Sequence, residues 1–316
     1  MSYYRELKQL VKATIKAREP LSKHTSFRIG GPAQLWVEPA DEGALQKLLR
    51  FAQAKRIPVS IIGAGSNMLI KDTGIRGIVI SLSAAPFKKI EQKGKRHLVV
   101  GSGVHLNRLI AFTAEHSLGG CEFLSGIPAT VGGALVMNAG TNSTRRGKRT
   151  RNSIGDIVQE VIVMDYSGRV RTLKRNKLQF WYRGSNLSPY IILSAKLHVQ
   201  PKPSYKIKRE LHKYISLRQS TQETRFPSAG CIFKNFEFNT AFSVGNESLS
   251  AGWIIEQCGL KGRRVNDAVI SRKHANYIIN RGSARAEDVM KLMEIIRRTV
   301  NKKFRIILNP EIKILG

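Results

Sequence analysis

The chain has 316 residues, of which 42% are apolar and 24% are charged, and it contains three Cys. This composition is typical of a folded globular protein and excludes the disordered, collagenous and disulfide-stapled classes. Cys121, Cys231 and Cys258 are too few and too scattered for a disulfide framework, and none lies in a spacing typical of zinc sites. The sequence therefore predicts a protein of the reducing cytoplasm, with no metal site.

The 53 Lys and Arg exceed the 22 Asp and Glu, which gives a formal net charge of +31. Such a field attracts nucleic acids and phosphorylated small molecules alike. The sequence contains no RNP, zinc-finger or helix-turn-helix pattern. Its densest basic run, TRRGKRTR at 144–151, lacks interleaved aromatic residues. Nucleic acid is therefore not expected as a partner, and the basic loop 141–152 is predicted to be a solvated surface insertion.

The N-terminal string YYRELKQLVKATIKA has apolar residues at helical spacing, which predicts a helix rather than a signal peptide. No stretch approaches the roughly 18 apolar residues of a transmembrane helix, so we expect no membrane partner. Short apolar stretches follow between 34 and 82 and predict strands. They alternate with one helical pattern, DEGALQKLLRFAQAKR, whose shared apolar face consists of Leu45, Leu48, Leu49 and Ala52. Residues 1–82 thus form the first predicted domain.

A second mixed segment, 83–201, combines the strand HLVVGSG, the helix HLNRLIAFTAEHSL and two later strands around VQEVIVMDYSGRVRTL and YIILSAKLHV. DYSGRV predicts a hairpin turn between strands. The Pro-containing string PKPSYK marks a boundary, after which 202–316 form the third predicted domain. This domain opens with the helix KIKRELHKYISLRQ and ends with the helix AEDVMKLMEIIRRTVNKKF and the strand RIILNPEIKIL.

The string IPVSIIGAGSNMLIKD places a Gly-containing turn, Gly63 to Asn67, between two predicted strands. Glycines at such a turn allow backbone N–H groups to hold a pyrophosphate, although a simple tight turn between strands uses the same residues. Met68 occupies the third Gly position of the dinucleotide fingerprint, and a Gly-Lys-Ser/Thr ending is missing. The string therefore excludes both a Rossmann fingerprint and a P-loop.

A second string, GCEFLSGIPATVGGALVMNAG, is rich in Gly and small residues and carries no charge after Glu122. Its length and small side chains favour a backbone surface laid along an extended, flat cofactor, and close packing of backbone against backbone is the alternative. One long dinucleotide that contacts both Gly-containing strings would explain them together. FAD has the required length and charge.

Several ordered strings together resemble the UDP-N-acetylenolpyruvoylglucosamine reductase (UDP-N-acetylmuramate dehydrogenase) family: HTSFRIGGPA, GAGSNMLI, GIPATVGGALVMNAG, WYRGS, FPSAGCIFKN, AGWIIEQCGLKG, SRKHANYIIN and NPEIKILG. The resemblance extends from about Lys23 to the C-terminus and is specific because of the order and spacing of the strings. It implies an α+β protein in which two subdomains form an FAD-binding fold of the vanillyl-alcohol oxidase type, followed by a C-terminal α/β substrate-binding domain. The short connection after WYRGS resembles the subgroup that lacks an extra substrate-clamping loop.

This resemblance implies FAD-mediated reduction of UDP-N-acetylenolpyruvoylglucosamine to UDP-N-acetylmuramate, in peptidoglycan precursor synthesis, with NADPH as hydride donor. FAD is expected to bind non-covalently, since no residue matches a covalent flavin linkage. The residues predicted to contact FAD come from the two Gly-containing strings: Gly63, Ala64, Gly65, Ser66, Asn67, Gly126, Ile127, Pro128, Thr130, Val131, Gly132, Gly133, Asn138 and Ala139.

The same resemblance implies that Arg183 and Glu311 stabilise the enolate-like species that forms after hydride transfer. The proton donor matches Cys231, at a position where many members have Ser. A thiol with an ordinary pKa near ~8.5 is protonated at neutral pH and is a better acid than a hydroxyl, so the exchange preserves the role. Lys234 and Asn235, soon after this thiol, are expected to contact the substrate.

His274 and Glu256 are interpreted as structural, because His274 lacks a metal-ligand spacing and the inferred catalytic roles are already filled. Two alternative functions remain at this point. One is an FAD-dependent oxidase or dehydrogenase of the same fold, which would act on a different substrate. The other is a basic nucleic-acid-binding protein built on that scaffold.

Overall fold

The computed structural model of the chain describes residues 2–145, 148–235, 243–244, 247–248 and 250–316. These residues form two compact units, each assembled from segments that are distant in sequence. Unit 1 comprises Met1–Arg18, Gln34–Ala64 and Gly77–Arg218, and unit 2 comprises Glu19–Ala33, Gly65–Arg76 and Gln219–Gly316. The three-domain division into 1–82, 83–201 and 202–316 stays a prediction. No helix in the described ranges is long and apolar enough to cross a membrane.

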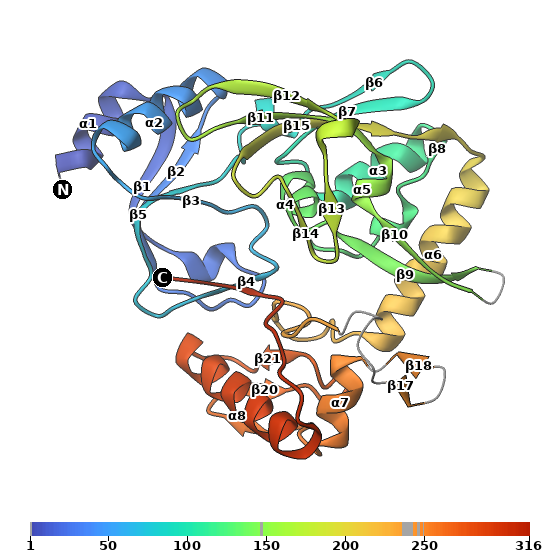
Figure 1. Cartoon of the computed structure of the whole chain (residues 1–316). Helices are drawn as coiled ribbons and strands as arrows, with labels where there is room; N and C mark the ends of the chain where they lie inside the picture. The colour runs from blue at the N-terminus through green and yellow to red at the C-terminus, as the bar shows by residue number, and fades with distance from the viewer. Residues whose placement is uncertain (1, 146–147, 236–242, 245–246, 249) are drawn as a thin grey trace. The chain divides into compact units, whose positions relative to one another are not determined.

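The first sheet of unit 1 has the strand order β1-β2-β5-β3, and α1 and α2 lie beside it (Figure 1). The predicted helical face of α2 is confirmed, since Leu45, Leu48, Leu49 and Ala52 are all buried. Asp41 caps this helix by accepting a hydrogen bond from Ala44 N at 2.8 Å. The elements are α1 Ser2–Leu10, β1 Ala13–Pro20, β2 Pro32–Pro39, α2 Glu42–Ala54, β3 Val59–Ile61 and β5 Ile75–Ile80.

The prediction of one helix over YYRELKQLVKATIKA was wrong in its second half. The helix ends at Leu10, and the chain continues as the edge strand β1. Val11 and Ile15 are buried in the core between the sheet and α2. Ala40 N also donates to Lys12 O at 2.9 Å. Strand pairing and burial therefore outweigh the local helical periodicity.

The second sheet of unit 1 is antiparallel, with the order β12-β11-β15-β7-β6, and α3 and α4 lie on one side of it (Figure 1). The predicted turn at DYSGRV is confirmed, because Asp165 accepts hydrogen bonds from Ser167 N and Arg169 N at 2.9 and 3.0 Å. The elements are β6 Ile90–Lys93, β7 His97–Gly101, α3 Leu106–Glu115, α4 Val131–Val136, α5 Ile154–Ile157, β11 Val158–Met164, β12 Val170–Lys174 and β15 Ile191–His198.

Short paired strands complete unit 1, and α6, Ser204–Thr221, leads out of it. The basic insertion 141–152 is not an irregular loop, because β9 and β10 form an antiparallel pair in which Gly140 faces Ser153. Residues 146–147 at its tip lie outside the described residues. The short strands are β8 Leu118–Gly119, β9 Gly140–Arg145, β10 Lys148–Ser153, β13 Phe180–Trp181, β14 Gly184–Ser185 and β16 Gln200–Pro201.

Unit 2 packs the helix α8 against β19 and β20, with α7 beside it. Its core contains Phe27 and Leu69 together with apolar side chains of α7 and α8. A parallel pair joins β22 to β4. The elements are β4 Met68–Ile70, β17 Ser243–Val244, β18 Glu247–Ser248, α7 Ala251–Gln257, β19 Arg264–Val265, β20 Ala268–Ile270, β21 Ile278–Asn280, α8 Ala286–Phe304 and β22 Lys313–Leu315.

The predicted final strand RIILNPEIKIL was correct only at its end, over Lys313–Leu315. Arg305 has a φ of 58° and ends α8 in the left-handed conformation. Pro310 interrupts the following segment because it has no N–H for a strand ladder. Residues 306–312 consequently lie outside any regular strand, and Pro310 takes part only in an isolated bridge to Phe233.

We expect Asp72→Ala to lower the free energy of unfolding by about 1–2 kcal/mol, as does the loss of other helix caps. The Asp72 carboxylate accepts hydrogen bonds from Ala286 N and Glu287 N at 3.0 and 3.1 Å, at the start of α8. Urea unfolding measures the loss. Asp72→Asn is the matched control, since its one remaining acceptor oxygen preserves part of the cap. Equal unfolding midpoints for Asp72→Ala and the unchanged protein would contradict this role.

Candidate active site

Two of the predicted catalytic residues, Cys231 and Glu311, lie on neighbouring backbone segments of unit 2. Glu311 N donates to Ile232 O at 2.8 Å, and Lys234 N donates to Asn309 O at 2.9 Å. These bonds form an antiparallel bridge centred on Phe233 and Pro310. The fold therefore brings the thiol-bearing and carboxylate-bearing segments together, although they are far apart in sequence.

Asn67 holds the Glu311 segment from its other side. Its side-chain Nδ2 donates to Glu311 O at 3.3 Å, and its backbone O accepts from Lys313 N at 3.0 Å. The parallel pairing of β4 with β22 starts directly after this contact. Asn67 was predicted as an FAD contact, and the structure shows its amide nitrogen engaged with the segment that carries Glu311.

The Cys231 segment is held in place by residues 271–280, which have the sequence SRKHANYIIN. Cys231 bridges to Tyr277, and the buried Asn276 amide brackets Phe233, accepting from its N at 2.9 Å and donating to its O at 2.8 Å. The sequence interpretation missed Asn276, although the string that contains it carried part of the family resemblance. His274 Nδ1 accepts from Asn276 N at 3.2 Å, and burial lowers the pKa of His274. This contact agrees with the structural role expected for His274.

The two predicted substrate contacts follow the thiol. The Asn235 side chain accepts a hydrogen bond from Ala251 N at 3.0 Å and so fixes the first turn of α7. Lys234 is half-buried. The expected structural role of Glu256 agrees with its ion pair to Lys261. Residues 236–242, which follow directly, lie outside the described residues.

Arg183 belongs to unit 1, where it occupies the tip of the hairpin formed by β13 and β14. Its φ of 56° lies in the left-handed region, which non-glycine residues adopt mainly in turns. Its guanidinium lies 5.7 Å from the centre of the Tyr182 ring. At Gly184 an added Cβ would come within 2.1 Å of Trp181 Nε1, so glycine here leaves room for the indole ring.

In unit 1, predicted FAD contacts from the two Gly-containing strings lie next to one another. A Cβ added to Gly63 would lie 2.5 Å from Thr130 Oγ1, and Thr130 Oγ1 accepts from Gly133 N at 3.3 Å. Gly132 N donates to Ser102 O at 2.9 Å. The end of β3 and the start of α4 therefore approach each other closely, which is possible because both strings use glycine here.

Two buried hydroxyls, Ser83 Oγ and Ser102 Oγ, have no hydrogen-bond partner within the described part of the chain. Ser102 lies directly against Gly132 and is 4% exposed. A buried hydroxyl without a partner is costly, so a polar ligand beside it would recover that energy. Together with the small-residue surface, these hydroxyls fit a hydrogen-bonding cofactor such as FAD. The sequence interpretation missed both, although the GSG string at 101–103 is a signal that could have identified Ser102.

Other predicted FAD contacts have structural roles of their own. Val131 and Ala139 are buried in the core of unit 1. The Asn138 amide donates to Trp181 O at 3.0 Å and accepts from Gly155 N at 3.1 Å. In unit 2, Gly65 O accepts from Ser26 N at 3.2 Å. If these four residues contact the cofactor, they use atoms that are not already engaged in core packing or in the hydrogen bonds named above.

A buried ion pair anchors the start of the Gly-rich string. Glu122 is 5% exposed and accepts from Gly120 N at 2.7 Å and from Lys202 Nζ at 2.8 Å. Lys202 also pairs with Glu210 of α6 at 2.8 Å. Burial opposes the charge on Lys202, but the two carboxylates outweigh it and raise its pKa. Burial raises the pKa of the neighbouring Cys121 thiol to about 12, which keeps that thiol protonated.

Two parts of the chain match known protein families, and these matches define its class. Residues 33–174 match the FAD binding domain family, and residues 221–315 match the family of UDP-N-acetylenolpyruvoylglucosamine reductase C-terminal domains. The chain is therefore an FAD-dependent oxidoreductase, and the predicted cofactor is confirmed.

Full-length relatives then define the family. UDP-N-acetylenolpyruvoylglucosamine reductases from Desulforamulus reducens and Clostridioides difficile are 38% and 39% identical, over 98% and 99% of this chain and 97% of each relative. The crystal structure of the reductase from Thermus caldophilus has a TM-score of 0.76 and 32% identity, covering 97% of this chain and 100% of that chain. The chain belongs to the UDP-N-acetylenolpyruvoylglucosamine reductase family, which confirms the predicted family and fold.

We expect Ser102→Ala to weaken FAD binding by roughly three- to tenfold, the value of one hydrogen bond, without destabilising the apoprotein. The variant removes a buried hydroxyl that lacks a partner in the described residues. Fluorescence titration of the apoprotein with FAD, together with its thermal unfolding, measures both quantities. Ser167→Ala is the control, because its hydroxyl hydrogen-bonds to Asp165 in a surface turn. FAD affinity that is unchanged in Ser102→Ala would contradict the proposed contact.

Proposed function

We propose that this chain reduces UDP-N-acetylenolpyruvoylglucosamine to UDP-N-acetylmuramate in peptidoglycan precursor synthesis, with NADPH as the electron source. The observation that carries this proposal is the alignment with reductases that are 38–39% identical to this chain over nearly the full length of both proteins. The adjacency of the Cys231 and Glu311 segments supports it at the level of the site. Family membership also favours a reductase over the oxidase alternative.

Bound FAD would supply hydride-transfer chemistry between NADPH and the enolpyruvyl double bond of the substrate. Cys231 then delivers a proton from its Sγ to the adjacent carbon, which completes the saturated lactyl ether. Arg183 stabilises the negative charge that develops on the carboxylate-conjugated fragment. Glu311 contributes a hydrogen bond to the same fragment, which requires its protonated form. Lys234 and Asn235 bind the substrate beside the thiol.

The non-covalent FAD contacts proposed for this chain are the residues predicted from the two Gly-containing strings, with Ser83 and Ser102 added. Gly63, Thr130 and Gly132 are supported by their mutual close approach. Residues 1–82 and 83–201 would provide the flavin-binding subdomains, and 202–316 the substrate-binding domain. The cytoplasm is the compartment in which nucleotide-linked substrates and NADPH are available to it.

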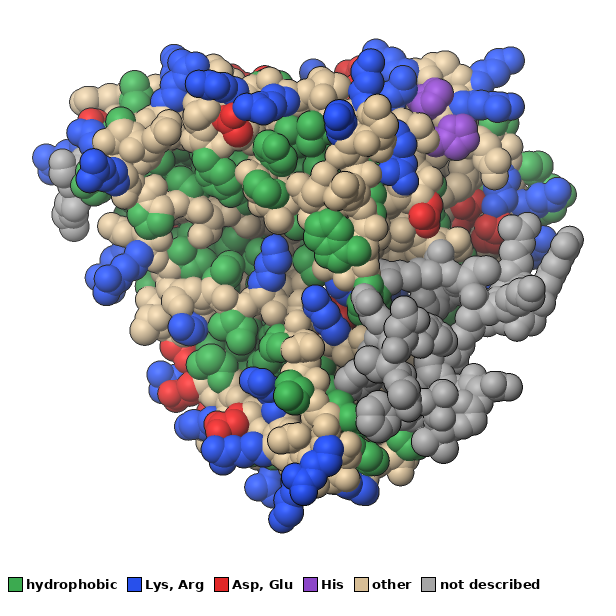
Figure 2. All heavy atoms as spheres, viewed as in Figure 1, with side chains coloured by type: hydrophobic (Ala, Val, Ile, Leu, Met, Phe, Trp, Pro, Cys, Tyr) green, Lys and Arg blue, Asp and Glu red, His purple; other side chains and the backbone are tan. Residues whose placement is uncertain are grey.

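The positive charge suits these anionic reactants, and nucleic acid is not proposed as a partner. In the view of Figure 2, Lys and Arg side chains are scattered over the surface rather than gathered into one stripe. Positive charges distributed in this way attract small anions but do not form a continuous basic surface along which a nucleic acid could bind.

We expect Cys231→Ala to slow the substrate half-reaction by a factor on the order of 10²–10⁴, the usual effect of removing a general acid. Reduction of the flavin by NADPH should be unaffected, because that step requires no proton on the substrate carbon. Stopped-flow flavin absorbance measures each half-reaction separately. Cys231→Ser should retain part of the activity, because the hydroxyl can still deliver a proton. Cys258→Ala, which removes another half-buried thiol, is the control. Reoxidation of Cys231→Ala at the normal rate would show that Cys231 is structural.

We expect kcat/KM for both NADPH and the nucleotide substrate to fall as salt is added, because screening weakens the attraction between these anions and a chain of charge +31. Initial rates over a series of NaCl concentrations measure the effect. Fluorescence anisotropy with a short labelled duplex DNA is the parallel control. Salt-independent rates combined with tight DNA binding would instead assign the charge to a polyanionic partner.

A further inference from the structure

Unit 2 contains a groove of about 520 Å³ between α8 and the segment that follows it. The residues that line it are Met290, Met293, Glu294, Arg297, Arg298, Asn301, Ile307, Leu308, Pro310 and Ile314. One wall of the groove is therefore helical, and the other is the segment that leads to Glu311. Pro310, which bridges to Phe233, borders both this groove and the candidate active site.

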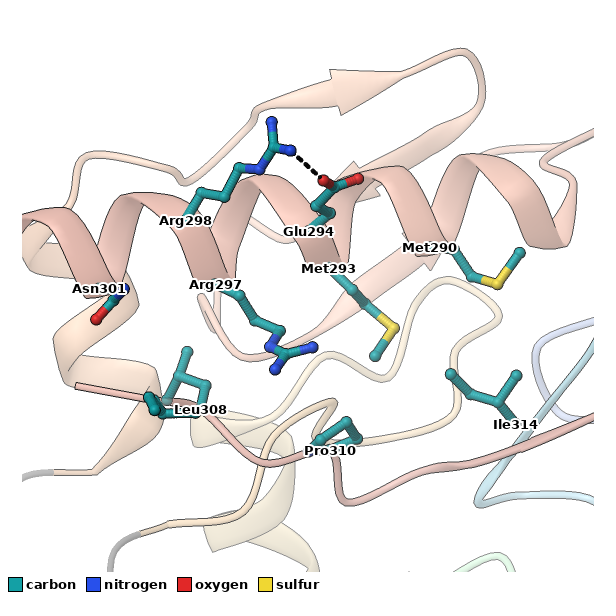
Figure 3. A pocket seen from close by; sticks show the side chains of 10 residues that line it. Met290, Met293, Glu294, Arg297, Arg298, Asn301, Leu308, Pro310 and Ile314 are labelled. Atoms are coloured by element: carbon teal, nitrogen blue, oxygen red, sulfur yellow. Dashed lines mark ion pairs between the residues drawn. The ribbon is translucent and has the colours of Figure 1, made fainter. Parts of the chain in front are cut away.

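The groove has an apolar lining with two strongly exposed side chains. In Figure 3, Met290 and Met293 point from α8 toward Pro310 and Ile314 on the opposite wall. Ile307 is 66% exposed and Ile314 is 39% exposed. Methionine adapts its shape to different apolar partners, so such a lining suits a docked side chain.

One positive charge projects into this apolar lining. Arg297 points into the groove, whereas Glu294 and Arg298 neutralise each other in a 2.7 Å ion pair (Figure 3). Within the described ranges Arg297 has no ion-pair partner. The groove therefore combines apolar contact surface with an uncompensated cation, a combination that is complementary to a carboxylate next to an apolar side chain.

The non-helical wall also offers main-chain donors. The N–H groups of Ile306 and Ile307, which precede the fully buried Leu308, donate no hydrogen bond to another described residue. An unpaired N–H on an accessible segment can pair with a carbonyl of a bound peptide. This favours an extended occupant. A second copy of the chain is disfavoured, because each copy carries a net charge of +31.

We propose that this groove binds an extended acidic peptide segment of a partner protein. The peptide places an apolar side chain on Met290 and Met293 and a carboxylate on Arg297. A carbonyl of its backbone accepts a hydrogen bond from the N–H of the exposed Ile307. The site is a protein-docking surface of unit 2 and does not depend on the proposed reaction.

The test uses the six methionines of the chain as probes. The FAD-loaded protein is labelled with [methyl-13C]methionine and titrated with a synthetic peptide in which Glu and Leu alternate. The Met290 and Met293 methyl signals should shift, and the other four methionines report whether the fold is intact. Arg297→Glu should weaken binding by a factor on the order of ten or more, because it replaces attraction by repulsion. Arg263→Glu, an exposed site outside the groove lining, should bind as the unchanged protein does.

Four outcomes would overturn the proposal. They are no shift of Met290 and Met293, an equal shift with a Lys–Leu peptide, binding retained by Arg297→Glu, and equal shifts of all six methionines. Two further titrations identify other occupants. Shifts that depend on protein concentration alone would indicate a second copy of the chain. Shifts produced by phosphatidylglycerol vesicles but not by the Glu–Leu peptide would indicate a membrane surface.

Discussion

The organisation of unit 2 depends on one backbone constraint, which is that the segment from Asn309 to Leu315 is hydrogen-bonded along both of its sides. The Ile232–Lys234 segment binds one side, and Asn67 with β4 binds the other. The Glu311 backbone is thereby fixed before any ligand contributes, and preorganised groups avoid the cost of ordering during the reaction. The groove beside α8 borders the same segment, so the same bonds position part of one wall of the groove.

The organisation of unit 1 depends on close packing between backbone segments rather than on a segment that is hydrogen-bonded along both sides. Gly63 and Gly132 let the end of β3 and the start of α4 approach neighbouring elements, and a Cβ at either position would require its neighbours to move. The Glu122–Lys202 pair fixes the start of the same Gly-rich string. A buried pair of this kind contributes little net stability, but the loss of one partner leaves a costly isolated charge. The Glu122–Lys202 pair therefore fixes the position of the first residues of the Gly-rich string in the fold.

The sequence was informative wherever a pattern was local. Helix α2 and the Asp165 turn were predicted because periodicity and turn chemistry act over a few residues. β1 was missed because its pairing partner lies in a later segment. The bonds that join Asn67 to Glu311 were missed for the same reason, and no local pattern signals that Asn276 brackets Phe233. Family strings marked the candidate catalytic residues, but they did not show which of the marked residues also stabilise the fold, as the Asn138 amide does.

The pairing of β4 with β22 also constrains how the chain reaches its native state. Asn67 and the Glu311 carbonyl that it binds are 244 residues apart. Closing so long a loop is slow, and chains emerge from the ribosome N-terminal end first. Unit 2 can close only after Leu315 has been synthesised. Until then the apolar β4 residues Leu69 and Ile70, which are fully buried in the native fold, lack their partner strand and are open to aggregation or chaperone binding.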